Sequence, residues 1–108
     1  MKALTFQGEG EVKVLDVPRP SIASSGDALV KVTLGAVCGS DLHILHGHTP
    51  MSPGAVLGHE FVGLVEEVGG EVKRFKAGDR VWGSNQGLLG RQGTFAEFAC
   101  TADRKSVV

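Results

Sequence analysis

Short runs of apolar residues recur along the chain, and clusters of turn residues separate them. The runs are rich in valine, phenylalanine, leucine and threonine, and several alternate apolar with polar positions, as half-buried strands do. They predict six strands, at residues 3–6, 12–17, 28–37, 61–68, 80–82 and 94–100. No stretch of comparable length has helical spacing.

The breaks between these runs carry turn chemistry. Glycine, proline, serine and aspartate gather there, at residues 8–10, 18–20, 24–27, 69–71 and 76–79. Glycine supplies 16 of the 108 residues, roughly twice its usual share of about 7%. Six short strands joined by such turns predict a mainly β fold, either a partly closed barrel or a sandwich.

One short helix is predicted from Ser40 to His46, with Ser40 or Gly39 as its N-cap and Gly47 at its end. Cys38 then lies just ahead of the helix N-terminus. The helix dipole favours a thiolate at that place, and the thiolate is the form of cysteine that binds metal.

Length and charge restrict the classes of function. The size suits one domain, covering residues 1–108. Eleven basic residues oppose 12 acidic ones without runs of either sign, which argues against nucleic acid or a membrane surface as a partner. Charge and glycine enter within the first nine residues, too early for a signal peptide. We therefore expect a cytoplasmic protein with thiols, rather than a disulfide, at Cys38 and Cys100.

Two stretches carry the candidate chemistry, Cys-Gly-Ser-Asp-Leu-His at residues 38–43 and Gly-His-Glu-Phe-Val-Gly at residues 58–63. A thiolate and an imidazole are ligands that Zn²⁺ prefers, and a carboxylate beside the imidazole can bind the metal or support a ligand. Cys38, His59 and Glu60 are the three candidate ligands. Three ligands fit a catalytic or an incomplete site better than a closed structural one.

The second stretch raises a geometric difficulty. Consecutive residues of a regular strand point to opposite faces, so His59 and Glu60 could face one metal only if the backbone bends. Gly58 and Gly63 permit such a bend. His59 is therefore the first candidate, and Glu60 depends on the bend.

Four other residues are less informative. His46 and His48 fall in a polar loop, where surface histidines without a function are common, and Cys100 ends an apolar run typical of the core. Trp82 has two interpretations that the sequence leaves open, a core residue or the wall of an apolar substrate pocket.

At these motifs the chain resembles the zinc-dependent alcohol dehydrogenases of the medium-chain dehydrogenase/reductase superfamily, and in particular their N-terminal GroES-like domain. The resemblance rests on residues 38–43, on the run Gly-His-Glu-Phe-Val-Gly-Leu-Val-Glu-Glu-Val-Gly at 58–69, and on Phe-Lys-Ala-Gly-Asp-Arg-Val at 75–81. It implies a GroES-like, partly closed β-barrel with one short helix, truncated before the Rossmann domain that binds NAD or NADP. The chain itself contains no Gly-x-Gly-x-x-Gly fingerprint.

The same resemblance implies a metal site. Cys38 and His59 would bind the catalytic zinc, with Glu60 behind the metal or entering its ligand shell. Asp41 would accept a hydrogen bond from the far ring nitrogen of His59 and so fix its tautomer.

It also implies the reaction, in which a small alcohol and its aldehyde or ketone exchange a hydride with NAD or NADP. Ser40 and His43 resemble the proton relay, in which the Ser40 hydroxyl takes the proton of the substrate alcohol and His43 passes it to solvent. Because no cofactor-binding residues are present, the 108-residue chain alone is expected to be inactive.

Two departures from the family keep other functions open. Residues 83–93 lack the four closely spaced cysteines of a structural zinc, which predicts a single zinc site and also suits a zinc-free quinone or enone reductase. The chain stops at what looks like an interrupted strand, residues 105–108. A third alternative is a non-enzymatic association module built like the GroES co-chaperonin, with the loop at 46–55 as its contact and homo-oligomers formed through unpaired strand edges.

Overall fold

The computed structural model describes residues 1–84, 91–102 and 106–107, and the fold is mainly β, as predicted. Its elements are β1 (Lys2–Gly8), β2 (Glu11–Asp16), β3 (Asp27–Gly35), α1 (Gly39–Leu45), β4 (Phe61–Val68), β5 (Arg80–Gly83), β6 (Phe98–Ala102) and β7 (Ser106–Val107). In the part of the chain that is described, no helix is long and apolar enough to cross a membrane.

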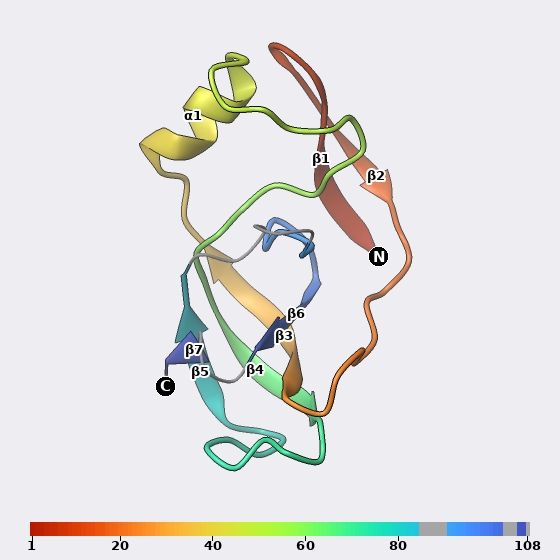
Figure 1. Ribbon diagram of the computed structural model, residues 1–108, viewed down its shortest axis with the longest axis vertical. Coiled ribbons are helices and arrows are strands. Elements are labelled where there is room, and N and C mark those ends of the chain that lie inside the picture. Colours follow the sequence, from red (N-terminus) through yellow and green to blue (C-terminus); the bar gives the residue numbers. More distant parts are fainter. Residues whose placement is uncertain (85–90, 103–105, 108) are drawn as a thin grey trace.

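The strands form two antiparallel sheets (Figure 1). β1 pairs with β2 in a hairpin, and the second sheet has the order β6-β3-β4-β5-β7. Figure 1 shows the hairpin and α1 together at one end of the molecule, above the larger sheet. They touch there, since the amide of Gly10 donates to the carbonyl of Leu45 at 2.6 Å. The described strands do not close into a complete barrel.

The core lies against the centre of the larger sheet. Along β4, buried positions alternate with more exposed ones, so one face of this strand meets the core. The core cluster consists of Val30, Phe61, Val65, Val72, Phe75 and Val81. β3 and β4 are therefore held together by this core as well as by their ladder, and the site described below is built at one end of the pair.

The prediction of a strand from Thr94 to Cys100 was wrong in its first half, because β6 begins only at Phe98. Residues 94–97 form bends and one isolated bridge, and most of their backbone hydrogen bonds are made outside the β6 ladder. The amide of Phe95 donates to the carbonyl of Leu57 at 2.9 Å, and the carbonyl of Phe95 accepts from the amide of Leu4 at 2.8 Å. This segment crosses between the two sheets, so its apolar alternation does not belong to one ladder.

Antiparallel pairing brings the two sequence motifs together. Gly35, the last residue of β3, lies opposite Phe61, the first residue of β4. Cys38 follows Gly35 by three positions and His59 precedes Phe61 by two, so both leave the sheet at the same end.

Cys100 is partly buried, rather than a full core residue, and lies beside an ion pair. Nη2 of Arg91 is 3.0 Å from Oδ1 of Asp27, whose side chain is only 5% exposed. The thiol of Cys100 is 3.9 Å from the other carboxylate oxygen. Burial, followed by the negative charge of Asp27, raises the pKa of the Cys100 thiol, and Arg91 opposes this in part.

We predict slow alkylation of Cys100. In a Cys38→Ser variant, where Cys100 carries the only thiol, iodoacetamide at pH 8 should react more slowly than with a small peptide thiol, because less thiolate is present. The difference should shrink as the pH rises through the raised pKa. The same variant unfolded in urea should react at the peptide rate, and an equal rate for the folded chain at pH 8 would contradict the raised pKa.

Candidate metal centre

Three potential metal ligands converge just beyond the paired ends of β3 and β4. One ligand atom each from Cys38, His59 and Glu60 lies within 4.8 Å of the other two, and all three residues are partly buried. Nε2 of His59 is 3.7 Å from Oε1 of Glu60. Two motifs about 20 positions apart in sequence thus supply one thiol, one imidazole and one carboxylate to a single point.

Cys38 itself is the N-cap of α1, so the prediction that Ser40 or Gly39 caps this helix was wrong. The amide of Ser40 donates to Sγ at 3.4 Å. In return, the amide of Cys38 donates to Oδ2 of Asp41 at 2.9 Å, which completes a capping box. A sulfur atom can fill the capping position as an oxygen does because it also accepts a hydrogen bond. The cap fixes the direction of the thiol.

The strand-alternation difficulty is resolved because His59 and Glu60 precede β4 and are not part of its ladder. Gly58 has a φ of +100°, a left-handed conformation that favours glycine. A Cβ atom built on Gly58 would also lie 2.6 Å from the amide nitrogen of Phe95. The bend at Gly58 allows the next two side chains to face the same side.

Thr94 holds this bend in place from the crossing segment. Its amide donates to the carbonyl of Gly58 at 3.0 Å, and its hydroxyl donates to the carbonyl of Glu60 at 3.1 Å. The residue is only 1% exposed. Thr94 therefore fastens the backbone on both sides of His59. The sequence gives no signal for this role of Thr94, because it places the residue only at the start of a predicted strand.

Asp41 lies behind His59. Its side chain is 7% exposed, and its Oδ1 is 3.4 Å from Nδ1 of the imidazole. Oδ1 is buried and has no hydrogen-bond partner among the described residues. At this distance a small rotation of the ring would complete the bond, which would leave a proton on Nδ1 and the lone pair of Nε2 directed toward Cys38 and Glu60.

The two residues predicted to form a relay occupy different surroundings. The hydroxyl of Ser40 is 3.1 Å from Sγ of Cys38 and 3.4 Å from Nε2 of His59, so it lies at the mouth of the cluster. His43 is exposed, one turn further along α1. Its ring contact is with His48, at 3.4 Å between the two Nδ1 atoms, rather than with Ser40.

Trp82 is 48% exposed, so it is not a core residue. It lines a pocket of about 370 Å³ together with Leu34, Phe61 and Glu60. Because Glu60 also belongs to the ligand cluster, this mostly apolar pocket opens directly beside the candidate metal centre.

Comparisons with known proteins agree with this fold and donor set. The family model of the alcohol dehydrogenase GroES-like domain matches residues 24–108. The chain therefore belongs to this family, within the medium-chain dehydrogenase/reductase superfamily.

Among curated proteins, the chain is 55% identical over 82 residues to the uncharacterized zinc-type alcohol dehydrogenase-like protein AdhB of Bacillus subtilis. That match covers 75% of this chain and 22% of the relative. The chain thus spans about a fifth of the length of this curated relative.

Solved structures with this fold include both alcohol dehydrogenases and quinone oxidoreductases. The alcohol dehydrogenase from Thermus sp. ATN1 superimposes with a TM-score of 0.86 at 35% identity, covering 95% of this chain and 38% of that one. The quinone oxidoreductase from Coxiella burnetii gives a TM-score of 0.87 at 26% identity, and the match covers 99% of this chain and 36% of that one. The GroES-like fold predicted from the sequence is confirmed.

The segment 83–93, where the sequence predicts no structural zinc, falls mostly at residues 85–90, outside the described part of the chain. The predicted absence of a second zinc there stays a prediction.

The role of Thr94 can be tested by stability. Thr94→Val keeps the shape of the side chain but removes the hydroxyl, and it should lower the free energy of unfolding in urea by about 1–2 kcal/mol because the partly buried carbonyl of Glu60 loses this donor. Thr94→Ser keeps the hydroxyl and should recover part of the loss. Equal stability of wild type and Thr94→Val would show that the hydroxyl does not hold the bend.

Proposed function

We propose that residues 1–108 form the zinc- and substrate-binding part of an NAD(P)-linked alcohol dehydrogenase. One observation carries this proposal, the convergence of Cys38, His59 and Glu60 on one point. The name of the Bacillus subtilis relative, a zinc-type alcohol dehydrogenase-like protein, supports it.

The donor set fits a zinc ion. Sulfur, imidazole nitrogen and carboxylate oxygen are the ligand types of zinc sites, and catalytic sites use three protein ligands and keep a fourth position open. Asp41 adds a further argument, because its buried, unbonded Oδ1 faces the ring nitrogen that must carry the proton when Nε2 binds metal. Cys38 and His59 would hold the metal, with Glu60 as a third or exchanging ligand.

A zinc ion bound there would supply Lewis acidity that makes an alcohol hydroxyl acidic or polarises a carbonyl. The side chains of this chain then handle the proton. Ser40 lies at the mouth of the cluster and takes the proton from the substrate hydroxyl at its Oγ. The exposed His43, one turn further along α1, would pass the proton on to solvent.

The pocket beside Trp82 would bind the carbon skeleton of the alcohol or carbonyl compound. Its walls are largely apolar, and it borders Glu60, so a small substrate could lie there with its oxygen toward the ligand cluster. NAD or NADP would bind outside residues 1–108, since the match covers only 22% of the Bacillus subtilis relative.

A second candidate is a zinc-free quinone or enone oxidoreductase. The close superposition with the quinone oxidoreductase of Coxiella burnetii favours it. The ligand cluster argues against it, because a site that binds no metal has no need for a thiol, an imidazole and a carboxylate within 4.8 Å.

Zinc content separates these candidates. We expect the purified chain to bind one zinc ion per chain at the cluster, measured by elemental mass spectrometry after dialysis, and Cys38→Ser to lose it. Serine is a good N-cap, so this variant should keep its fold. Cys100→Ser is the matched control and should retain the metal. Equal zinc content in the wild type and Cys38→Ser, or an equal loss in both variants, would contradict the assignment.

Turnover tests the reaction separately. The 108-residue chain, loaded with zinc and supplied with NAD⁺ or NADP⁺ and a series of simple alcohols, should produce no reduced cofactor, measured by its absorbance. Steady alcohol oxidation by this chain would refute the proposal that the cofactor site lies elsewhere.

A further inference from the structure

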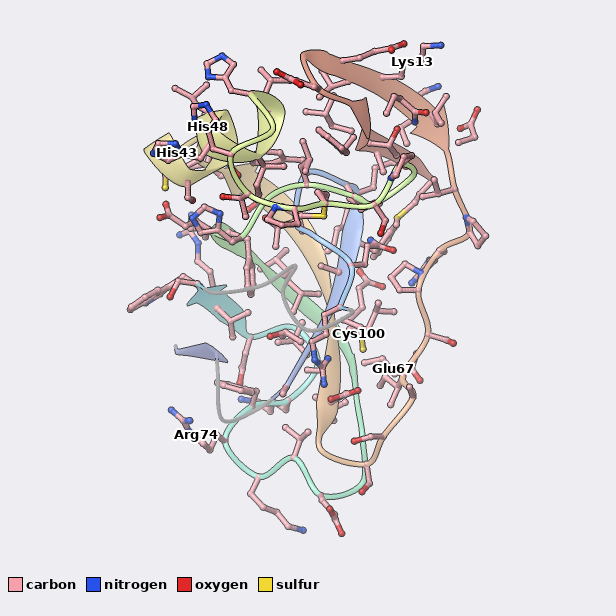
Figure 2. The ribbon with its side chains drawn as sticks, turned by 45° about the horizontal axis from the view of Figure 1, so that its top comes forward. Lys13, His43, His48, Glu67, Arg74 and Cys100 are labelled. Carbon is pink, nitrogen blue, oxygen red and sulfur yellow. The ribbon has the colours of Figure 1, made fainter. Side chains whose placement is uncertain are left out.

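Three histidines lie within six residues at the end of α1 and just after it, at positions 43, 46 and 48. All three are exposed, which agrees with the prediction that His46 and His48 are surface residues. The structure nevertheless brings two of them together. The rings of His43 and His48 have centroids 5.7 Å apart, and their Nδ1 atoms are separated by 3.4 Å (Figure 2).

The backbone holds this pair, because α1 ends in a Schellman motif. The amide of His48 donates to the carbonyl of His43 at 2.9 Å, and the amide of Gly47 donates to the carbonyl of Ile44 at 3.1 Å. Gly47 has the left-handed φ of +80° that the motif requires. In this motif the residues at the positions of His43 and His48 are frequently in side-chain contact. The helix end therefore places the two imidazoles side by side.

The separation of the two nitrogens suits a metal ion. Zn²⁺ binds imidazole nitrogen at about 2.0–2.1 Å, so two such nitrogens on a tetrahedral ion lie about 3.4 Å apart. Without a metal, the same contact requires one ring to donate and the other to accept. A carboxylate is also near, since the Glu9 side chain packs against Gly47 of the same turn and adds negative charge there.

We propose that His43 and His48 form a second site for a first-row transition metal ion, such as Zn²⁺, Ni²⁺ or Cu²⁺, bound through both Nδ1 atoms. Water fills the remaining coordination positions. This site, here called the histidine pair, is distinct from the cluster of Cys38, His59 and Glu60. It is expected to prefer Cu²⁺ over Ni²⁺ and Zn²⁺, as nitrogen ligands generally do.

His46 provides a matched control. It lies in the same turn and is also exposed, but its ring centroid is 6.1 Å from that of His48 and no hydrogen bond links the two rings in the described part of the chain. The histidine pair therefore does not need it.

The test is a titration of the chain with Ni²⁺. Binding is measured by equilibrium dialysis and by changes in the ring signals of the histidines in NMR spectra. His48→Gln keeps a polar side chain and leaves Gly47 in place, so the helix end should persist. This variant should bind one Ni²⁺ fewer per chain, or bind that equivalent roughly tenfold or more weakly. His46→Gln should bind as much Ni²⁺ as the wild type. In the wild type, Ni²⁺ should change the ring signals of His43 and His48 before those of any other histidine except His59.

Equal Ni²⁺ binding by the wild type and His48→Gln would overturn the proposal, and so would an equal loss in His46→Gln. The Cys38, His59 and Glu60 cluster is intact in all three proteins. The difference of one equivalent therefore tests the histidine pair whether or not that cluster binds metal.

Discussion

The antiparallel pairing of β3 with β4 is the constraint on which the candidate site depends. Gly35 and Phe61 are paired at the end of this ladder, and the residues just beyond them carry the thiol, the imidazole and the carboxylate. Burial of Val30, Phe61 and Val65 in one core fixes the register, because a slip of one residue would turn the apolar face of β4 to solvent. The packing that stabilises the sheet thereby sets the distance between the two motifs.

Local interactions then orient each ligand. Cys38 is both a helix cap and a potential metal ligand, and Asp41 both completes the capping box and lies against His59. On the other side, the bend at Gly58 is fastened by Thr94 from the crossing segment. The same side chains therefore serve folding and the site, so a substitution in either motif should affect both stability and metal binding.

Much of this arrangement could be predicted from the sequence. Apolar alternation located the strands, and residue type and resemblance singled out Cys38, His59 and Glu60 as one cluster. The N-cap was misplaced because propensities rank serine and glycine above cysteine at that position. Thr94 and the contact between His43 and His48 were missed because each depends on a partner whose position only the folded backbone reveals. The start of β6 was misplaced for the same reason, since Phe95 bonds to Leu4 of β1 and to Leu57 before the chain joins the ladder with β3.

The most direct test of the central claim is X-ray absorption spectroscopy at the zinc edge on the chain loaded with one equivalent of zinc. The account predicts one sulfur neighbour at about 2.3 Å, from Cys38, and nitrogen or oxygen neighbours at about 2.0–2.2 Å, from His59 and the other ligands. A shell of nitrogen and oxygen alone would contradict it, because the metal would then be bound without the thiol that caps α1.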